Sequence, residues 1–276
     1  MVNAAAIKAR VARWRYVVPN AITCASLTVG LAGCVLAFVS HDFVGAAWLV
    51  VLSVLLDKLD GTVARLLKAT SAIGVQLDSF ADFVVFGVAP GAFLYAAGLD
   101  QHMQGRGPWS GQVGGIVLGV LCALYVVAAC LRLAKFNVLA AVPSPPGAPK
   151  VFYGLPSTFA GGLLALTYIL AAKYEVTAVL DYLPVLAFGC GLMMLSNLPL
   201  PKLVPRKDKV INVLQAINIV VVYVFGIARL FPEYLWSNVI LYALIGFGWG
   251  IANREKLLAA RLLDPYEAPD PPDDDE

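Results

Sequence analysis

Four aspartates, Asp57, Asp60, Asp78 and Asp82, interrupt two otherwise apolar stretches of this 276-residue chain. The members of the first pair are three residues apart and those of the second pair four apart, so on helices each pair would share one face. An uncompensated charge inside a membrane costs about 2.5–3.5 kcal/mol, so four would cost on the order of 10 kcal/mol. Two nearby basic residues cannot neutralise all four, and the carboxylates therefore need another partner.

The residue types around these aspartates favour a metal and phosphate site. Oxygen ligands without a neighbouring histidine or cysteine suit a hard cation, so we expect two divalent cations, Mg²⁺ or Mn²⁺. Gly61 and Ala64 leave a bare patch of helix where a ligand can approach the backbone. Arg65 supplies a forked donor suited to phosphate oxygens. Together these groups indicate a diphosphate site; the alternative is an interhelical Asp–Lys/Arg network that only holds the helices together.

The elements that must position these residues are membrane-spanning helices. The chain is 60% hydrophobic and 14% charged, whereas soluble domains are nearer a quarter charged. Its continuous apolar runs are long enough to cross about 30 Å of hydrocarbon, which predicts an all-α, polytopic transmembrane helical bundle. We expect eight helices, at approximately residues 20–40, 43–65, 75–97, 112–134, 156–174, 178–198, 210–230 and 234–252.

Lysine and arginine are unevenly distributed between the two sides of this predicted bundle. With the N-terminus inside, sixteen of the 20 fall on the inner side, Lys58 lies within the membrane, and only Arg106, Lys173 and Arg229 fall outside. Positively charged loops tend to remain cytoplasmic. We therefore expect an integral, multi-pass protein of the bacterial inner membrane with both termini in the cytoplasm.

We expect four parts along the chain. Residues 1–19 form a basic segment, for which a short helix in the membrane interface and a plain charged tail are equally compatible. Residues 20–200 form the membrane core and residues 201–253 two additional transmembrane helices. Residues 254–276 are acidic and broken by prolines, which predicts a disordered cytoplasmic tail.

The aspartates belong to a longer pattern with fixed spacing, Asp57-x2-Asp60-Gly61-x2-Ala64-Arg65-x8-Gly74-x3-Asp78-x3-Asp82. This pattern resembles in full the signature of the CDP-alcohol phosphotransferases, membrane enzymes that join a CDP-linked lipid or alcohol to a second alcohol. Eight fixed positions make the signal specific. The resemblance covers the first six helices, the usual family core, and leaves helices seven and eight as additions.

The resemblance implies roles for single residues. Asp57, Asp60 and Asp78 would hold one divalent cation, and Asp57, Asp78 and Asp82 the second. Asp82 also matches the position of the general base. The CDP-lipid would be contacted by Asn20, Thr23, Gly61, Ala64, Arg65, Ser71 and Gly74, the first two through the segment PNAIT.

The residues themselves agree with a carboxylate base. The two histidines, His41 and His102, fall in expected outer loops far from the aspartates. Asp82 is then a candidate because it can keep one oxygen free to accept a proton. No nucleophilic Ser–His or Cys–His arrangement stands out, which favours direct attack on phosphorus over a covalent enzyme intermediate.

Three further stretches indicate the acceptor alcohol: LDSFADFVVFGVAPG, LRLAKFNV and FYGLPSTFAGGL. They resemble the phosphatidylserine synthase branch of the family, although Thr62 and Lys135 stand where familiar members have arginine. The branch implies transfer of a phosphatidyl group from CDP-diacylglycerol to L-serine, with release of CMP. Arg132, Lys135 and Asn137 are candidates to hold the serine carboxylate or a lipid phosphate; alternatively, they only form a charged helix end.

Two other functions remain compatible with the sequence. A sister enzyme would use glycerol 3-phosphate or an inositol phosphate, acceptors that should need a larger basic cluster. A cation transporter would spread its acidic groups across the membrane depth, whereas here they lie near one face. The partners we expect are CDP-diacylglycerol, L-serine, membrane lipids and a second copy of the chain in a homodimer, without a nucleic acid.

Overall fold

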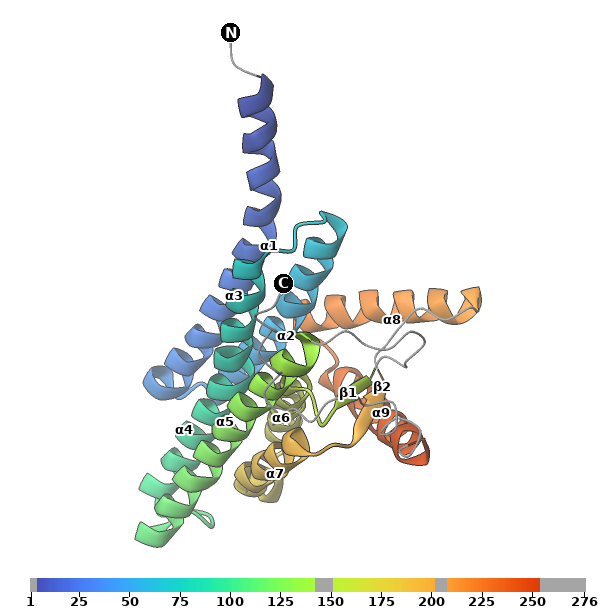
Figure 1. The fold of residues 1–276 in the computed structure, drawn as a ribbon. Coiled ribbons are helices and arrows are strands. Elements are labelled where there is room, and N and C mark those ends of the chain that lie inside the picture. The colour runs from blue at the N-terminus through green and yellow to red at the C-terminus, as the bar shows by residue number, and fades with distance from the viewer. Residues whose placement is uncertain (1–3, 142–150, 202–207, 254–276) are drawn as a thin grey trace, which may run out of the picture.

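The computed structural model describes residues 4–141, 151–201 and 208–253, and within these ranges the chain is almost entirely helical (Figure 1). The first half comprises α1 (Ala4–Val35) continued by a π-helical turn η1 (Leu36–Ser40), α2 (Phe43–Leu66), and a rod made of α3 (Ala72–Asp82), η2 (Phe83–Val88) and α4 (Ala89–Met103). The second half comprises α5 (Gly111–Ala141), α6 (Ser157–Lys173), α7 (Thr177–Leu195), α8 (Lys209–Ala228) and α9 (Pro232–Ala252). Two short strands, β1 (Val151–Tyr153) and β2 (Pro199–Pro201), pair antiparallel.

These elements confirm the predicted all-α membrane bundle. Six helical segments are long and apolar enough to cross a membrane. The apolar helix α6 and helix α2, which carries the first aspartate pair, complete the eight predicted helices within the described residues. The acidic tail and most of the proline-rich inner loop lie outside the described residues.

The first helix begins earlier than the sequence predicted. It starts at Ala4 rather than near residue 20, and it passes through Pro19 without ending. A proline inside a helix removes one backbone hydrogen bond and crowds the carbonyl four residues earlier, at a cost of about 3 kcal/mol, but its backbone angle is helical and α1 continues through it. The segment PNAIT therefore lies within α1 instead of at the start of a helix.

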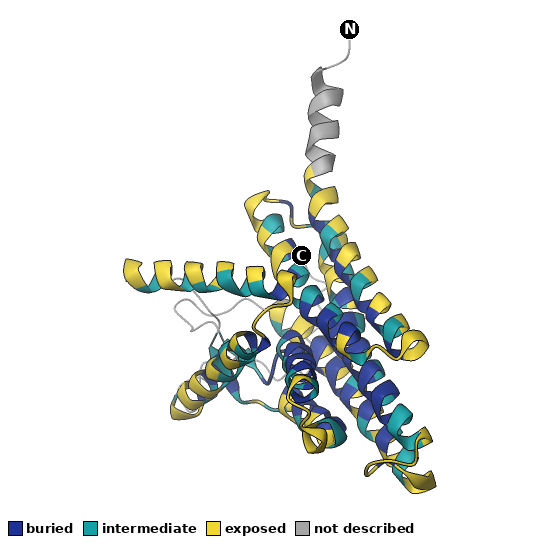
Figure 2. Cartoon of the chain, turned by 180° about the vertical axis from the view of Figure 1, so that it is seen from behind, coloured by how far each residue is buried: buried dark blue, intermediate teal, exposed yellow. Residues whose placement is uncertain are grey.

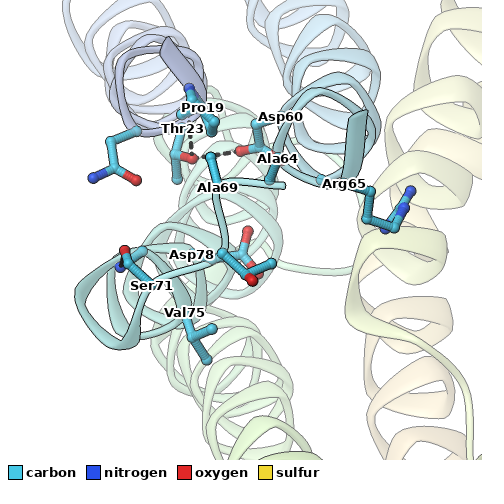
Figure 3. A pocket seen from close by; sticks show the side chains of 13 residues that line it. Pro19, Thr23, Asp60, Ala64, Arg65, Ala69, Ser71, Val75 and Asp78 are labelled. Atoms are coloured by element: carbon cyan, nitrogen blue, oxygen red, sulfur yellow. Dashed lines mark hydrogen bonds between the residues drawn. The ribbon is translucent and has the colours of Figure 1, made fainter. Parts of the chain in front are cut away.

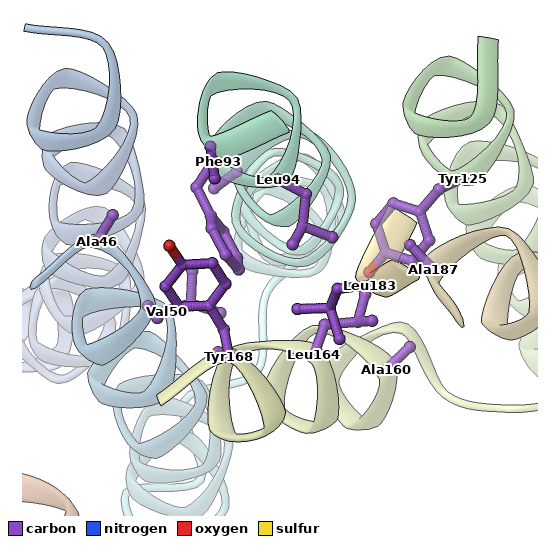
Figure 4. Packing of buried hydrophobic residues seen from close by; sticks show 14 of the residues in the cluster. Ala46, Val50, Phe93, Leu94, Tyr125, Ala160, Leu164, Tyr168, Leu183 and Ala187 are labelled. Carbon is purple, nitrogen blue, oxygen red and sulfur yellow. The ribbon is translucent and has the colours of Figure 1, made fainter. Parts of the chain in front are cut away.

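The core lies where α2, α4, α5, α6 and α7 meet (Figure 4). Tyr125 is fully buried there, and its hydroxyl donates a 2.7 Å hydrogen bond to the carbonyl of Phe86 in η2. Gly91 allows α4 and α5 to approach closely, because a Cβ at this position would lie 2.7 Å from a side-chain atom of Val126. Small residues at helix contacts are the usual means of close packing inside membranes. This packing fixes the rod that carries Asp78 and Asp82.

The two additional helices are attached to the core unevenly. Helix α8 extends to one side of the bundle, and most of its residues are exposed or half-buried (Figures 1 and 2). Its C-terminal half reaches α2, where the Tyr223 hydroxyl donates a 2.9 Å hydrogen bond to the Leu55 carbonyl. Helix α9 packs on α6 and on β2, where the Tyr242 hydroxyl donates to the Pro201 carbonyl at 2.7 Å.

Candidate active site

Helices α2 and α3 bring the aspartates together. One carboxylate oxygen each of Asp57, Asp60 and Asp78 lies within 4.8 Å of the others. Asp82, the last residue of α3, is outside that group, but it lies one helical turn after Asp78 and interacts electrostatically with Asp57 and Asp78. A compact set of carboxylate oxygens, without nitrogen or sulfur ligands, fits the donor preference of Mg²⁺ and Mn²⁺.

One cation of the chain already contacts this cluster. The Lys58 ammonium lies 2.7 Å from a carboxylate oxygen of Asp57, its neighbour in sequence. A second positive charge, on Arg132, interacts with Asp82 and Asp57, so these two cations offset only two of the four carboxylates if all four are ionised. The structure therefore agrees with the sequence-based expectation that further positive charge is needed.

Helix α1 also contacts the aspartate cluster, through a hydrogen bond from Thr23 to Asp60. The Thr23 hydroxyl donates a 2.6 Å hydrogen bond to Asp60 Oδ2, and both residues are buried, with exposed fractions of 6% and 4%. The same hydroxyl lies 3.1 Å from the Pro19 carbonyl, but its single proton favours the shorter, charge-assisted contact. This bond leaves the other oxygen of Asp60 available to a metal ion.

The beginning of α3 is shaped by a tight N-terminal cap. The Ser71 side chain accepts a 3.0 Å hydrogen bond from the Gly74 backbone N–H. A Cβ on Gly74 would lie 3.0 Å from Ser71 Oγ and 3.1 Å from Asn20 Oδ1. A side chain at Gly74 would therefore crowd the Ser71 cap and Asn20, where α1 comes close to the start of α3.

A cavity of about 160 Å³ opens between α1, α2 and α3 (Figure 3). All seven residues predicted to contact the CDP-lipid line it, together with two of the aspartates: Asn20, Thr23, Gly61, Ala64, Arg65, Ser71, Gly74, Asp60 and Asp78. A sequence pattern that spans more than fifty positions thus converges on one cavity. The cavity is also lined by Pro19, Ala69, Thr70 and Val75, which the sequence analysis did not single out.

Gly61 differs from Gly74 in what surrounds it. A Cβ on Gly61 would meet only Arg65 Nη1, at 3.5 Å, which is an ordinary contact. Packing within the protein therefore does not require a glycine here. The bare backbone faces the cavity, as expected where a ligand must come close.

Arg65 points away from the Asp60 carboxylate in Figure 3 and donates a 3.2 Å hydrogen bond to the Thr62 hydroxyl. Thr62 in turn donates to the Lys58 carbonyl one helical turn earlier, at 2.7 Å. Thr62, one of the departures from the familiar motif, thus holds Arg65 at the rim of the cavity.

The three candidate acceptor residues lie on α5 but have different partners. Arg132 is buried and donates a 2.9 Å hydrogen bond to Ser157 Oγ on α6, and its charge interacts with Asp82 and Asp57. Lys135 donates to Asn197 Oδ1 at 2.6 Å, and Asn137 donates to Ser79 Oγ at 3.1 Å. Arg132 therefore lies within electrostatic range of the aspartate cluster.

Two site features were not predicted. Ser157, fully buried at the start of α6, accepts the hydrogen bond that positions Arg132. The stretch FYGLPSTFAGGL contains this serine, but the sequence analysis did not single it out. The π-helical turn η2 begins directly after Asp82 and has no simple sequence signal.

The expectation that His102 lies in a loop was wrong: it is in the last turn of α4, where its Nδ1 lies 2.6 Å from the Trp109 carbonyl.

Comparison with known proteins gives a consistent result. The sequence profile of the CDP-alcohol phosphatidyltransferase family matches residues 16–195. The chain is similar to proteins named CDP-diacylglycerol–serine O-phosphatidyltransferase. It is 34% identical to the one from Helicobacter pylori (strain ATCC 700392 / 26695) over 192 residues, which cover 67% of this chain and 72% of the relative. It is 30% identical to the protein from Mycobacterium leprae (strain TN) over 250 residues, which cover 88% of this chain and 77% of the relative. It is 34% identical to the protein from Bacillus subtilis (strain 168) over 170 residues, which cover 57% of this chain and 88% of the relative.

Proposed function

The chain belongs to the CDP-alcohol phosphatidyltransferase family, and from that premise we propose that it transfers the phosphatidyl group of CDP-diacylglycerol to L-serine. The products are phosphatidylserine and CMP. The similarity to several relatives named for this reaction, at 30–34% identity, supports serine as the acceptor.

The observation that carries the proposal is the convergence of the motif on one cavity beside the aspartate cluster. Asn20, Ser71 and Gly74 line the same cavity as Asp60 and Asp78, so a CDP-lipid bound there would have its diphosphate next to these carboxylates. Arg65 at the rim is available to a phosphate oxygen, because its present partner is a neutral hydroxyl.

We propose that the aspartates hold two divalent cations, a proposal that the grouped oxygens of Asp57, Asp60 and Asp78 support. Asp57, Asp60 and Asp78 would hold one, and Asp57, Asp78 and Asp82 the other. Divalent cations at this place would stabilise negative charge on the diphosphate as the bond to CMP breaks. Thr23 keeps Asp60 oriented for this task through its 2.6 Å hydrogen bond.

Asp82 is the proposed general base. In a direct displacement the serine hydroxyl oxygen forms a bond to the lipid-linked phosphorus, the phosphorus–oxygen bond to CMP breaks, and the serine proton passes to a carboxylate oxygen of Asp82. Asp82 lies at the end of α3, one helical turn after Asp78, and interacts electrostatically with Asp57 and Asp78, which supports this role. Base catalysis of this kind contributes about 10²–10⁴-fold to a rate.

Arg132, Lys135 and Asn137 are proposed to bind the serine carboxylate or a lipid phosphate from α5. The electrostatic interaction of Arg132 with Asp82 favours a place for it near the attacking serine. We further propose that the protein acts as a homodimer in a bacterial inner membrane, with both termini in the cytoplasm. The charge distribution of the sequence supports this orientation.

An acceptor panel tests the proposal. Purified protein is given CDP-diacylglycerol, Mn²⁺ or Mg²⁺, and either L-serine, glycerol 3-phosphate, or an inositol phosphate, and the release of CMP is followed. We expect CMP release with serine alone, together with formation of phosphatidylserine. Release with a phosphorylated alcohol but not with serine would refute the acceptor assignment and leave the CDP-lipid half of the proposal standing.

A further inference from the structure

A second and larger cavity, of about 510 Å³, lies at the end of α2 that is opposite to the aspartates. Val44 and Trp48 of α2, Ile169 of α6, and Phe231 in the turn between α8 and α9 contribute to its walls. Trp48 precedes Asp57 by nine residues, which is about 14 Å along a helix axis at 1.5 Å per residue. The cavity is therefore separate from the proposed active site.

Two cations, Lys173 and Arg229, are the charged residues that line this cavity. Lys173 forms an ion pair with Glu233 at 2.5 Å, and Glu233 also accepts a hydrogen bond from the Tyr174 hydroxyl at 2.7 Å. Arg229 is exposed, and within the described part of the chain its side chain has no ion-pair or hydrogen-bond partner. Glu233 compensates the positive charge of Lys173, so the charge of Arg229 is the one that stays uncompensated in this cavity.

The backbone at Arg229 is in the left-handed conformation, with φ at 56°, where it ends α8. Glycine is the usual residue at such a helix end, because it avoids the steric cost that other residues bear there. The chain instead has an arginine, followed two residues later by Phe231, which is also left-handed, with φ at 46°. The turn thus has an arginine and a phenylalanine in the cavity wall at two positions where glycine would be less strained.

Trp48 adds a hydrogen-bond donor to the wall of this cavity. Its side chain is 7% exposed, its indole nitrogen is not among the fully buried unpaired atoms, and among the described residues none accepts a hydrogen bond from it. An indole N–H is a donor only, so an oxygen of a ligand in this cavity can accept from it.

We propose that this cavity binds an anionic phospholipid of the leaflet opposite to the active site. A phosphodiester carries one negative charge, which matches the uncompensated charge of Arg229, and its oxygens suit both the guanidinium and the Trp48 N–H. The apolar walls formed by Val44, Ile169 and Phe231 suit the start of an acyl chain rather than a hydrated anion. The bound lipid would join α2 and α6 to the α8–α9 hairpin.

Lipid binding by the detergent-purified full chain tests this proposal. Native mass spectrometry measures the affinity for short-chain phosphatidylglycerol, phosphatidylcholine and inorganic phosphate in wild type, Arg229→Gln and the control Arg106→Gln. Arg106 is also exposed and carries the same charge, but it lies in the turn after α4 and does not line the cavity. The active site is unaltered in both variants, so lipid bound there contributes equally to both.

We expect phosphatidylglycerol to bind wild type and Arg106→Gln alike and Arg229→Gln at least tenfold more weakly. Phosphatidylcholine should bind more weakly than phosphatidylglycerol, with little effect of either variant. Trp48→Phe, which keeps a ring but removes the N–H, should weaken phosphatidylglycerol binding as well. Equal binding of phosphatidylglycerol to Arg229→Gln and wild type would overturn the proposal. Inorganic phosphate that competes with the lipid at similar concentration would instead identify a site for a free anion.

Discussion

Replacement of Gly61 by alanine tests whether this glycine is required by the packing of the protein itself or by the binding of its ligand. The added methyl would lie 3.5 Å from Arg65 Nη1, with no closer atom, so the folded chain can accept it. Alanine in a helix interior is favoured over glycine by about 0.5–1 kcal/mol, so the variant should be at least as stable as wild type. The same methyl protrudes toward the cavity where the CDP-lipid is proposed to approach the backbone.

We expect Gly61→Ala to raise the KM for CDP-diacylglycerol at least tenfold, which corresponds to about 1.4 kcal/mol of binding free energy. Thermal unfolding should show an unchanged or higher Tm. Gly189→Ala is the matched control, because a Cβ there has no neighbour within 4 Å and the residue lies in α7, away from the cavity. An unchanged KM in a folded Gly61→Ala variant would refute the placement of the CDP-lipid against this helix.

Three further predictions concern the base, the acceptor and the topology. Asp82→Asn should lower turnover by about 10²–10⁴-fold while CDP-lipid binding is retained, because asparagine keeps a ligand oxygen but cannot accept the serine proton; loss of lipid binding as well would indicate a purely metal-holding role. Lys135→Ala should raise the serine KM by about 10- to 150-fold, the range for a lost charge-assisted contact of about 1.5–3 kcal/mol, and should raise it more than the CDP-lipid KM; equal effects on both substrates, or the same effect from Lys209→Ala, would indicate only a structural or surface-charge role. A reporter fused after Glu276 should read as cytoplasmic, and an external signal would contradict the predicted orientation.

The architecture of the core followed from the sequence because membrane helices leave a strong signal. Runs of about 20 apolar residues must be helical to satisfy their backbone groups in hydrocarbon. The start of the first helix was misjudged because Pro19 resembles a boundary, whereas its fixed backbone angle is compatible with α1. The turn η2 was not predicted, since a π-helical turn depends on packing such as the Tyr125–Phe86 hydrogen bond rather than on local composition.

The donor-side residues could be proposed because they match a family signature of fixed spacing, and the structure brings them to one cavity between three helices. The acceptor side was less predictable because its contacts join residues that are distant in sequence. Arg132 is 25 positions from Ser157, and Lys135 is 62 positions from Asn197. Their charges alone could not distinguish a ligand-binding residue from a basic helix end. The cavity at Arg229 could not be predicted from the sequence either, because it forms only where the α8–α9 turn lies beside α2 and α6.

The most direct test of the central claim is a binding measurement on the aspartate cluster. Mn²⁺ is titrated into the purified, metal-free full chain, and free Mn²⁺ is followed by electron paramagnetic resonance. We predict about two ions bound per chain in wild type, with both lost in Asp57→Asn and Asp78→Asn variants that remain folded, since each of these residues is proposed to contact both ions. Absence of Mn²⁺ binding by folded wild type, or undiminished binding by the Asp78→Asn variant, would contradict the proposal that these carboxylates form a divalent-cation site.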